Sequence, residues 1–427
     1  MSMRPRLSRV LSTIFTSNTL RDFRRSRARR KRGAVAEVHY FHQAADPYSH
    51  LAAQCLSRLQ AKYAIDVIPH IVPPPDDQAA PERTRLNIYA LRDAARVARR
   101  FGLHFPEGAE AQNPKIVSRA NAQLALAVAT GTFTADSVPI GDALWKGETA
   151  LRESADDAVT ARQLDEGNAL RARLGHYLSG MFHFEGEWYW GVDRLHHLES
   201  RLAFEKLVQT PDTPLIATYQ KEMLDGPRAK IPPLIEFWFS FRSPYSYIAA
   251  QRVHRMASHY GATVEWRFIL PMIMRGLPVP APKSRYITLD VKREADMLGI
   301  RYGTMVDPRG EGIHRALAVL HRAIQLGKGA EYAESGLAAA FADGIDMSTD
   351  SGLWRTAQRA GLTKADVAAA LADESWRPIA EKNRQALFDA GLWGAPTYRI
   401  NGGPAHWGQD RLWALEEDLK AAIAAQR

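Results

Sequence analysis

The sequence predicts an α/β protein made of two tandem copies of one domain, and three observations lead to this prediction. First, residues 38–67 align without a gap on residues 235–264. Second, both segments read as strand, helix and strand, which implies parallel pairing with a right-handed crossover. Third, the halves close on similar stretches, "FEGEWYWGVDRLHHLE" and "INGGPAHWGQDRLWALE". A chain of 427 residues suits two domains of ordinary size.

Each copy is expected to follow the same order of elements. An aromatic, β-branched strand leads into a helix and then into a second strand, "IDVIPHIV" or "ATVEWRFIL". A long helical region rich in Ala, Leu and Arg follows, and a short pair of strands and a final helix close the copy. This order is the thioredoxin architecture split by a helical domain. The predicted fold class is therefore α/β, with two tandem thioredoxin-like domains that each carry a helical insertion.

The domains are predicted at residues 34–224 and 234–427, joined by the linker "DGPRAKIPP" at residues 225–233, where Gly and Pro interrupt regular structure. Residues 1–33 form a basic arm with ten arginines and one lysine against a single acid, Asp22, so the arm carries +10 and the remaining residues about −1. A disordered or peripheral, solvated arm is favoured. An amphipathic segment on an anionic membrane and an organellar transit peptide are the alternatives.

The composition also bounds the compartment and the chemistry. No apolar run approaches the roughly 18 residues that a membrane span needs, so a soluble, cytoplasmic protein is expected. The single cysteine, Cys55, excludes an intrachain disulfide and a Cys-x-x-Cys motif, and is expected to be a buried, inert thiol. Where thioredoxin-like proteins carry that motif, this chain has "SPYS" at residues 243–246. A dithiol oxidoreductase is thus excluded.

Three motifs of the second half, "FSFRSPYSYIAAQ", "GAPTYRI" and "HWGQDRL", resemble the 2-hydroxychromene-2-carboxylate isomerases. These are relatives of the kappa-class glutathione transferases within the DsbA-like group. The resemblance covers both halves; it is strong over residues 235–427 and degraded over residues 38–207. It implies glutathione as cofactor, and a small aromatic or enone-like electrophile as substrate, in an isomerase or a transferase.

Ser243 is the predicted catalytic residue. Serine before proline at a strand-to-helix junction is a favoured N-cap, and the free N–H groups of a helix start suit an anion. The resemblance implies that this anion is the glutathione thiolate. A role for Ser243 as nucleophile is disfavoured, because no general base lies within the motif.

The resemblance implies further cofactor contacts. A cis proline at Pro396 would leave the backbone of Ala395 free to pair with the cysteinyl part of glutathione. Gln409 and Asp410 would hold the γ-glutamyl group, and Asp410 could equally cap the last helix. Lys283 would lie near the glycine carboxylate.

Four aromatic side chains of the second half are candidates for an apolar electrophile pocket, with core packing as the alternative. They are Trp393, Trp407, Phe241 and Tyr245.

The first half lacks the key residues of this site. Asp46 stands in place of Ser243, Gly180 in place of Pro396 and Met181 in place of Thr397. An aspartate about 4 Å from a thiolate would repel it by roughly 4 kcal/mol, although aspartate caps a helix as well as serine does. The first copy is therefore predicted to be structural, and the chain to be a pseudo-dimer with one live site.

Two further expectations concern metals and an alternative function. His39, His42, His196 and His197 show no metal-ligand spacing with cysteine or acidic partners, so no metal is predicted. The alternative to an enzyme is a non-catalytic thioredoxin-like scaffold whose arm contacts an anionic membrane or nucleic acid. No sequence-specific nucleic-acid partner is expected, and the arm is assigned at most a weak contact with an anionic surface.

Overall fold

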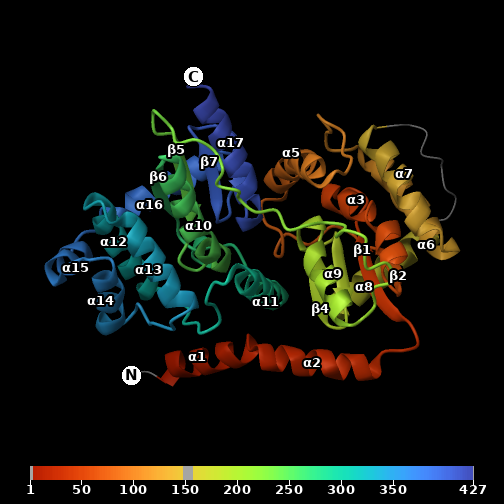
Figure 1. The fold of residues 1–427 in the computed structure, drawn as a ribbon, viewed down its shortest axis with the longest axis horizontal. Helices are drawn as coiled ribbons and strands as arrows, with labels where there is room; N and C mark the ends of the chain where they lie inside the picture. Colours follow the sequence, from red (N-terminus) through yellow and green to blue (C-terminus); the bar gives the residue numbers. More distant parts are fainter. Residues whose placement is uncertain (1–2, 148–156, 427) are drawn as a thin grey trace. The chain divides into compact units, whose positions relative to one another are not determined.

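The computed structural model describes residues 3–147 and 157–426, and these fall into two compact units (Figure 1). The N-terminal unit comprises residues 22–219 together with residues 280–286. The C-terminal unit comprises the chain up to residue 21, residues 220–279 and the chain from residue 287 onward. Each unit holds one four-stranded sheet with helices packed on it.

The sheet of the N-terminal unit has the strand order β2-β1-β3-β4. Strand β1 (Ala36–His42) pairs in parallel with β2 (Ile65–Ile71) and antiparallel with β3 (Met181–Phe184), which pairs with β4 (Glu187–Trp190). The helices are α3 (Pro47–Ala53), α4 (Leu56–Lys62), α5 (Arg83–Phe101), α6 (Pro114–Thr130), α7 (Phe133–Trp145), α8 (Asp157–Arg173) and α9 (Leu195–Phe204).

The sheet of the C-terminal unit has the corresponding order, β6-β5-β7-β8. Strand β5 (Leu234–Phe239) pairs in parallel with β6 (Thr263–Phe268) and antiparallel with β7 (Thr397–Ile400), which pairs with β8 (His406–Trp407). The helices are α10 (Pro244–Tyr260), α11 (Ala281–Leu298, whose first residues belong to the N-terminal unit), α12 (Glu311–Gln325), α13 (Gly329–Phe341), α14 (Asp350–Arg359), α15 (Lys364–Leu371), α16 (Trp376–Asp389) and α17 (Leu412–Ala424).

Alternation along β5 separates two faces of its sheet, because successive side chains of a strand point to opposite sides. Phe237 and Phe239 stack with ring centroids 5.5 Å apart, and Tyr398 of β7 stacks on Phe237 at 5.4 Å. On the other face the Trp238 ring lies under two arginines, Arg267 and Arg399. The aromatic stack anchors the strand from which the chain turns into α10.

The β-α-β opening and the closing strand pair predicted for both halves are present, with the predicted parallel pairing. One helix differs between the units. Helix α10 runs without a break, whereas the first half has α3 and α4, which are separated at Gln54 and Cys55. Cys55 is buried, as expected, and burial raises the pKa of its thiol to about 12, which keeps the thiol protonated and inert.

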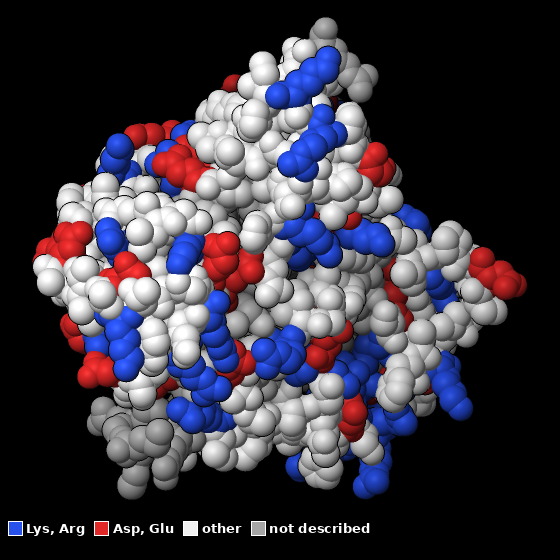
Figure 2. Space-filling model, turned by 60° about the vertical axis from the view of Figure 1, so that its left-hand side comes forward, with Lys and Arg blue, Asp and Glu red and all other residues white. Residues whose placement is uncertain are grey.

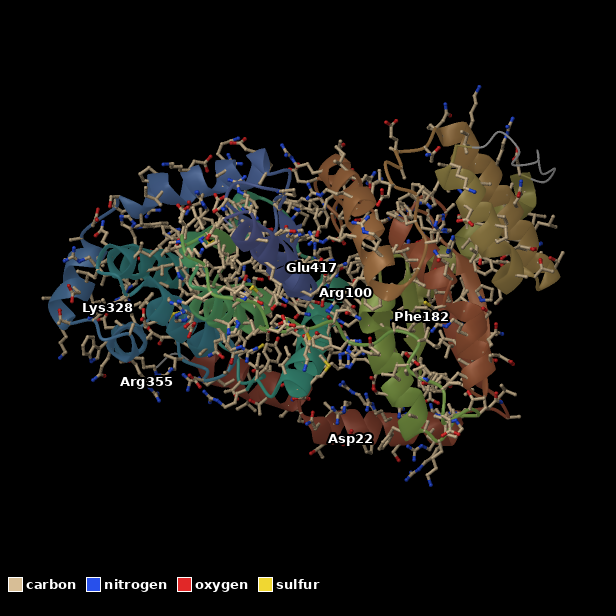
Figure 3. All side chains as sticks on the ribbon, turned by 45° about the horizontal axis from the view of Figure 1, so that its top comes forward. Asp22, Arg100, Phe182, Lys328, Arg355 and Glu417 are labelled. Atoms are coloured by element: carbon tan, nitrogen blue, oxygen red, sulfur yellow. The ribbon has the colours of Figure 1, made fainter. Side chains whose placement is uncertain are left out.

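The basic arm, for which the sequence favours a disordered or peripheral segment, is helical over most of its length. It forms α1 (Met3–Phe15) and α2 (Asn18–Lys31), on which Figure 3 labels Asp22. Arg25 forms a two-point ion pair with Glu187 of β4, and Arg29 forms one with Glu205 after α9. Tertiary ion pairs of this kind order a segment whose composition alone indicates a solvated tail.

Over the described ranges, no helix has both the length and the apolar character that a membrane span requires. On the face that Figure 2 shows, basic and acidic side chains are interspersed.

Candidate functional site

Ser243 lies at the N-cap of α10, with Pro244 at the first helical position. Its Oγ accepts a hydrogen bond from the Ser246 N–H at 3.1 Å and donates one to the Ala395 carbonyl oxygen at 3.0 Å. The side chain is partly exposed. The capping geometry predicted from "SPYS" is present, and the fold adds a contact across 152 positions of the chain that the motif does not reveal.

The peptide bond between Ala395 and Pro396 is cis, as the resemblance implies. Ala395 is partly exposed, and within the described residues its N–H has no hydrogen-bond acceptor. The Pro396 carbonyl, in contrast, accepts from the Gly408 N–H at 2.9 Å. Ala395 therefore presents its backbone beside the N-terminus of α10, next to Ser243.

Gln409 and Asp410 lie in a single 3₁₀ turn, residues Gln409–Arg411, that leads into α17. The Gln409 amide is buried and already engaged: its Oε1 accepts from Arg252 at 2.8 Å and its Nε2 donates to Glu294 at 2.8 Å. A direct contact of Gln409 with a ligand stays a prediction, and its present role is to fix the turn.

Asp410 does not cap α17, because the turn moves the helix start to the next residue and Arg411 occupies the N-cap position. The Asp410 carboxylate accepts from the Gln409 side chain and is partly exposed. The assignment of Asp410 to the γ-glutamyl group stays a prediction.

Lys283 belongs to the N-terminal unit and not to the unit that contains Ser243. Its Nζ donates to the Ala79 carbonyl oxygen at 2.9 Å. Burial lowers the pKa of this ammonium group to about 8. Lys283 and its partner Ala79 both belong to the N-terminal unit, so this hydrogen bond gives no support to a contact of Lys283 with the glycine carboxylate. That assignment stays a prediction.

The four candidate pocket aromatics divide between core and surface. Phe241 is 1% exposed and packs edge-on against Phe239, so core packing is its role. Trp393 is also buried, and its ring lies 4.8 Å from the partly exposed ring of Trp407. Tyr245 is partly exposed and donates its hydroxyl to Asp290 at 2.7 Å.

Sequence analysis missed one charged group beside Ser243. Arg242 makes a two-point ion pair with Asp307, with nitrogen–oxygen distances of 2.5 and 2.7 Å. Burial raises the pKa of Asp307, but Arg242 and Arg309 outweigh burial and hold it below its usual value. No local sequence pattern predicts this ion pair, because Asp307 lies far along the chain from Arg242, in the loop before α12. The pair fixes the residue immediately before the N-cap.

The equivalent position in the N-terminal unit is closed by the chain itself. The Asp46 carboxylate accepts from the N–H groups of Tyr48 and Ser49, and from the hydroxyls of Ser49 at 2.6 Å and Ser179 at 3.0 Å. Gly180, in the place of Pro396, lies so close that an added Cβ would be 3.4 Å from Asp46 Oδ2. Asp46 is the N-cap of α3, as predicted, and its carboxylate occupies the position at the helix start where an external anion would bind.

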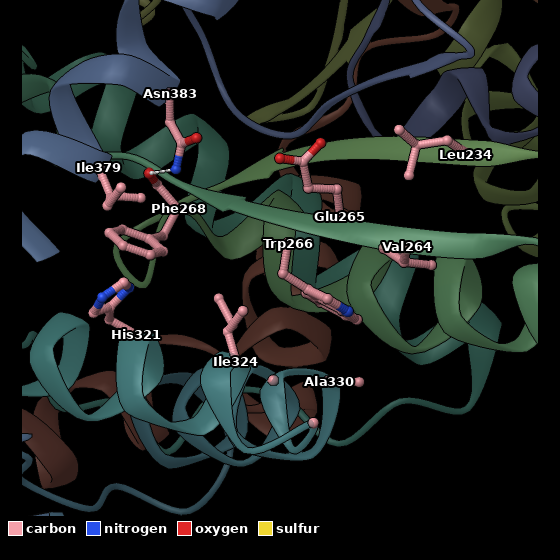
Figure 4. Close-up of a pocket in the computed structure, with 12 residues that line it drawn as sticks. Leu234, Val264, Glu265, Trp266, Phe268, His321, Ile324, Ala330, Ile379 and Asn383 are labelled. Atoms are coloured by element: carbon pink, nitrogen blue, oxygen red, sulfur yellow. Dashed lines mark hydrogen bonds between the residues drawn. The ribbon is translucent and has the colours of Figure 1, made fainter.

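A cavity of about 450 Å³ lies elsewhere in the C-terminal unit, along the edge strand β6 (Figure 4). Its lining includes Trp266, Phe268, His321, Ile324 and Asn383, and Asn383 donates to the Phe268 carbonyl oxygen at 3.1 Å. None of the predicted site residues lines this cavity, so it is separate from the start of α10.

Comparison with known proteins agrees with the topology of the C-terminal unit. Residues 234–420 match the DsbA-like thioredoxin domain family. The 2-hydroxychromene-2-carboxylate isomerase of Pseudomonas putida is 25% identical over 194 residues, which are 44% of this chain and 94% of that protein. The enzyme of the same name from Pseudomonas sp. (strain C18) is 23% identical over 197 residues, 44% of this chain and 91% of that protein.

Among solved structures, a 2-hydroxychromene-2-carboxylate isomerase aligns with a TM-score of 0.40 and 23% identity, covering 45% of this chain and 97% of that one.

Proposed function

We propose that the C-terminal unit, a DsbA-like thioredoxin domain, is a glutathione-dependent isomerase or transferase of the 2-hydroxychromene-2-carboxylate isomerase type. The observation that supports this proposal most directly is that the Ser243 hydroxyl caps α10 and donates a hydrogen bond to the backbone carbonyl of Ala395. In a chain without a Cys-x-x-Cys motif, this arrangement suits the binding of an external sulfur and not disulfide exchange.

The groups at this position can hold a thiolate. A thiol of pKa about 8.5 must be lowered by ~2 units to be ionised at neutral pH, equivalent to roughly 2.7 kcal/mol. A helix N-terminus contributes about 0.3–2 kcal/mol and one hydrogen bond to a charged group about 1.5–3 kcal/mol. Together these contributions cover the requirement.

The hydroxyl must change partner when sulfur enters. Ser243 now donates its proton to the Ala395 carbonyl, so it would turn from that oxygen toward the sulfur. The released carbonyl and the Ala395 N–H would then form a strand-like pair with the cysteinyl backbone of glutathione. Bound glutathione would supply a thiolate that adds to a conjugated enone, permits rotation about the former double bond and leaves unchanged. Ser243 keeps its oxygen aligned through the Ser246 N–H throughout.

Ser243→Ala tests the hydroxyl directly. We expect kcat/KM with glutathione to fall about 10- to 100-fold, because one hydrogen bond to a charged group is lost. In an ultraviolet titration of the bound thiolate, the pKa of the glutathione sulfur should rise by one to two units, on the order of the same energy. An unchanged rate and thiol pKa would reject the role of Ser243.

Ser243→Asp is the matched variant, because aspartate keeps the N-cap and brings a negative charge, as Asp46 does in the first half. Circular dichroism should show an intact fold while glutathione binding is lost. Retained binding in this variant would mean that the ligand does not place its sulfur at the start of α10.

We also propose that the N-terminal unit is a degenerate copy of the same thioredoxin-like fold, so that the chain is a pseudo-dimer. The identical order of strands and the gapless alignment of the β-α-β segments support this. The internal carboxylate of Asp46 is the reason that we assign the proposed activity to the second copy alone.

A further inference from the structure

Helix α1 is seated on the C-terminal unit through its hydroxyl groups. Ser8 donates to the Met305 carbonyl oxygen at 3.3 Å, Ser12 accepts from the Met305 N–H at 3.0 Å, and Thr16, just past the helix end, reaches the Gly303 carbonyl oxygen at 3.5 Å. These positions are four apart and therefore share one face of the helix. Thr16 is only 4% exposed, so this polar face is the buried one.

The opposite face of α1 is apolar and exposed. Leu7, Val10, Leu11 and Ile14 follow the spacing i, i+3, i+4, i+7, which forms a single stripe along a helix. Their exposed fractions are 59%, 55%, 56% and 55%. A surface helix normally turns such a stripe toward the protein core. Here the polar face meets the protein and the apolar stripe, defined by these four residues, is left facing outward.

The arm that carries the apolar stripe is strongly basic. Residues 1–33 hold +10, and α2, which follows α1 after two residues, exposes Arg27, Arg30 and Lys31. Phe23 of the same helix is 64% exposed. A helix that lies in the interface of an anionic membrane typically has two features, an exposed apolar face and neighbouring cationic side chains.

We propose that α1 docks this protein on the surface of an anionic lipid bilayer, with the apolar stripe in the boundary between headgroups and acyl chains, and that the positive charge of residues 1–33 strengthens binding to anionic headgroups. A second copy of the chain is a poor occupant, because two arms of +10 would repel each other. Nucleic acid matches the charge but offers a phosphate backbone and no cover for four aliphatic side chains. The proposal is independent of glutathione chemistry.

Vesicle flotation with the full chain tests the proposal. We expect the wild-type protein to float with vesicles of phosphatidylcholine and phosphatidylserine, and to bind pure phosphatidylcholine vesicles far more weakly. Leu11→Asp/Ile14→Asp should lower the bound fraction about ten-fold or more, because two carboxylates enter the apolar stripe. The matched control is Asn18→Asp/Thr19→Asp, which lowers the net charge by the same amount at exposed positions outside the stripe. Its bound fraction should fall only by the effect of the lower net charge, and should stay well above that of the stripe variant.

A fluorescent label gives an independent readout of insertion. Native Cys55 is 1% exposed, so an environment-sensitive dye can be attached selectively to Leu11→Cys or Thr19→Cys. Anionic vesicles should blue-shift the dye at position 11 and leave it nearly unchanged at position 19.

Three results would overturn the proposal: no flotation of the wild-type chain, equal flotation of the stripe variant, or equal binding to neutral vesicles. If the stripe variant instead converts a dimer to a monomer in the absence of lipid, the occupant is a second copy and the membrane proposal fails. Each readout is made without glutathione, so it stays informative whatever the outcome at Ser243.

Discussion

Ser243 and Asp46 show how one residue decides what a helix N-terminus can bind. Both are N-caps, and both accept hydrogen bonds from the first backbone N–H groups of their helix. Serine leaves the positive end of the helix without a full countercharge, whereas aspartate supplies that charge from within the chain. Burial raises the pKa of Asp46, with the hydroxyls of Ser49 and Ser179 opposing the rise. The contrast was predictable from sequence, because a cap is a local feature.

A second contrast at the residue scale lies on the other face of each sheet, and the sequence did not reveal it. In the C-terminal unit Glu236 is held between Arg267 and Arg399 on neighbouring strands. The N-terminal unit has a histidine at each matching position: His39 faces His183 across β1 and β3, and His39 Nδ1 lies 3.0 Å from His70 Nε2. Spacing along the chain gives no sign of this cluster, because sheet register alone brings the three rings together.

The histidine cluster predicts a loss of stability in mild acid. Burial, with a smaller effect of His39, lowers the pKa of His70 and of His183 to about 4, below the value near 6.5 of an unfolded chain. The unfolded state therefore takes up protons first as the pH falls. Stability is unaffected above about pH 6.5 and is lost progressively toward pH 4, by about 2 kcal/mol at pH 5 for the buried His183 alone.

Thermal melts of the full chain between pH 7.5 and 5 measure this effect. The drop in Tm should be clearly smaller in His183→Gln than in wild type. His104→Gln, an exposed histidine of the same unit, is the matched control and should keep the wild-type drop. If His183→Gln and wild type lose the same stability on acidification, the cluster does not govern the acid response.

At the scale of elements, helices α9 and α17 each hold one end of the chain segment at residues 216–224 through a buried glutamate. Glu416 of α17 accepts from the N–H groups of Met223 and Leu224, both at 2.6 Å, and from the Tyr260 hydroxyl at 2.7 Å. Glu199 of α9 does the same for Ile216 and the Tyr63 hydroxyl. The predicted linker at residues 225–233 is therefore preceded by a segment that is held at both ends.

Glu416→Ala should release this segment. Three hydrogen bonds to the Glu416 carboxylate are lost inside the protein. Each hydrogen bond to a buried charge contributes about 1.5–3 kcal/mol, so we expect the free energy of unfolding to fall by several kcal/mol. Hydrogen exchange at the amides of Met223 and Leu224 should accelerate markedly. The neighbouring Glu417, labelled in Figure 3, is exposed, and Glu417→Ala should leave both quantities near wild type. Equal exchange in the two variants would show that Glu416 does not hold the segment.

Elements with local signals were predictable, and elements stabilised by distant partners were not. The strand-helix-strand openings and the N-cap at Ser243 follow from residue patterns a few positions long, and the structure contains them. The arm helices were missed, since the ion pairs of Arg25 and Arg29 reach acids more than 150 positions away. Asp410 was placed one residue too early as a cap, because a 3₁₀ turn precedes α17 and gives no distinct sequence signal.

At the scale of the whole molecule, duplication raises the question of how many ligand sites one chain carries. The two sheets share one strand order, so fold alone would allow two sites. The residues at the two helix starts favour one site, because Asp46 fills the helix start in the first unit and Gly180 stands there in the place of Pro396. Met181 follows Gly180 where Thr397 follows Pro396.

Isothermal titration of glutathione into the full chain decides between these outcomes, and the expected stoichiometry is one per chain. The Ser243→Asp chain should give no binding heat, whereas Asp46→Ala, which removes the internal carboxylate, should leave the single site of the second unit with its wild-type affinity. Both variants keep all 427 residues, so a difference between them reports on the site and not on truncation. Two equivalent sites in wild type would overturn the proposal of one site per chain. One site that survives Ser243→Asp and disappears in Asp46→Ala would move the proposed activity to the first unit.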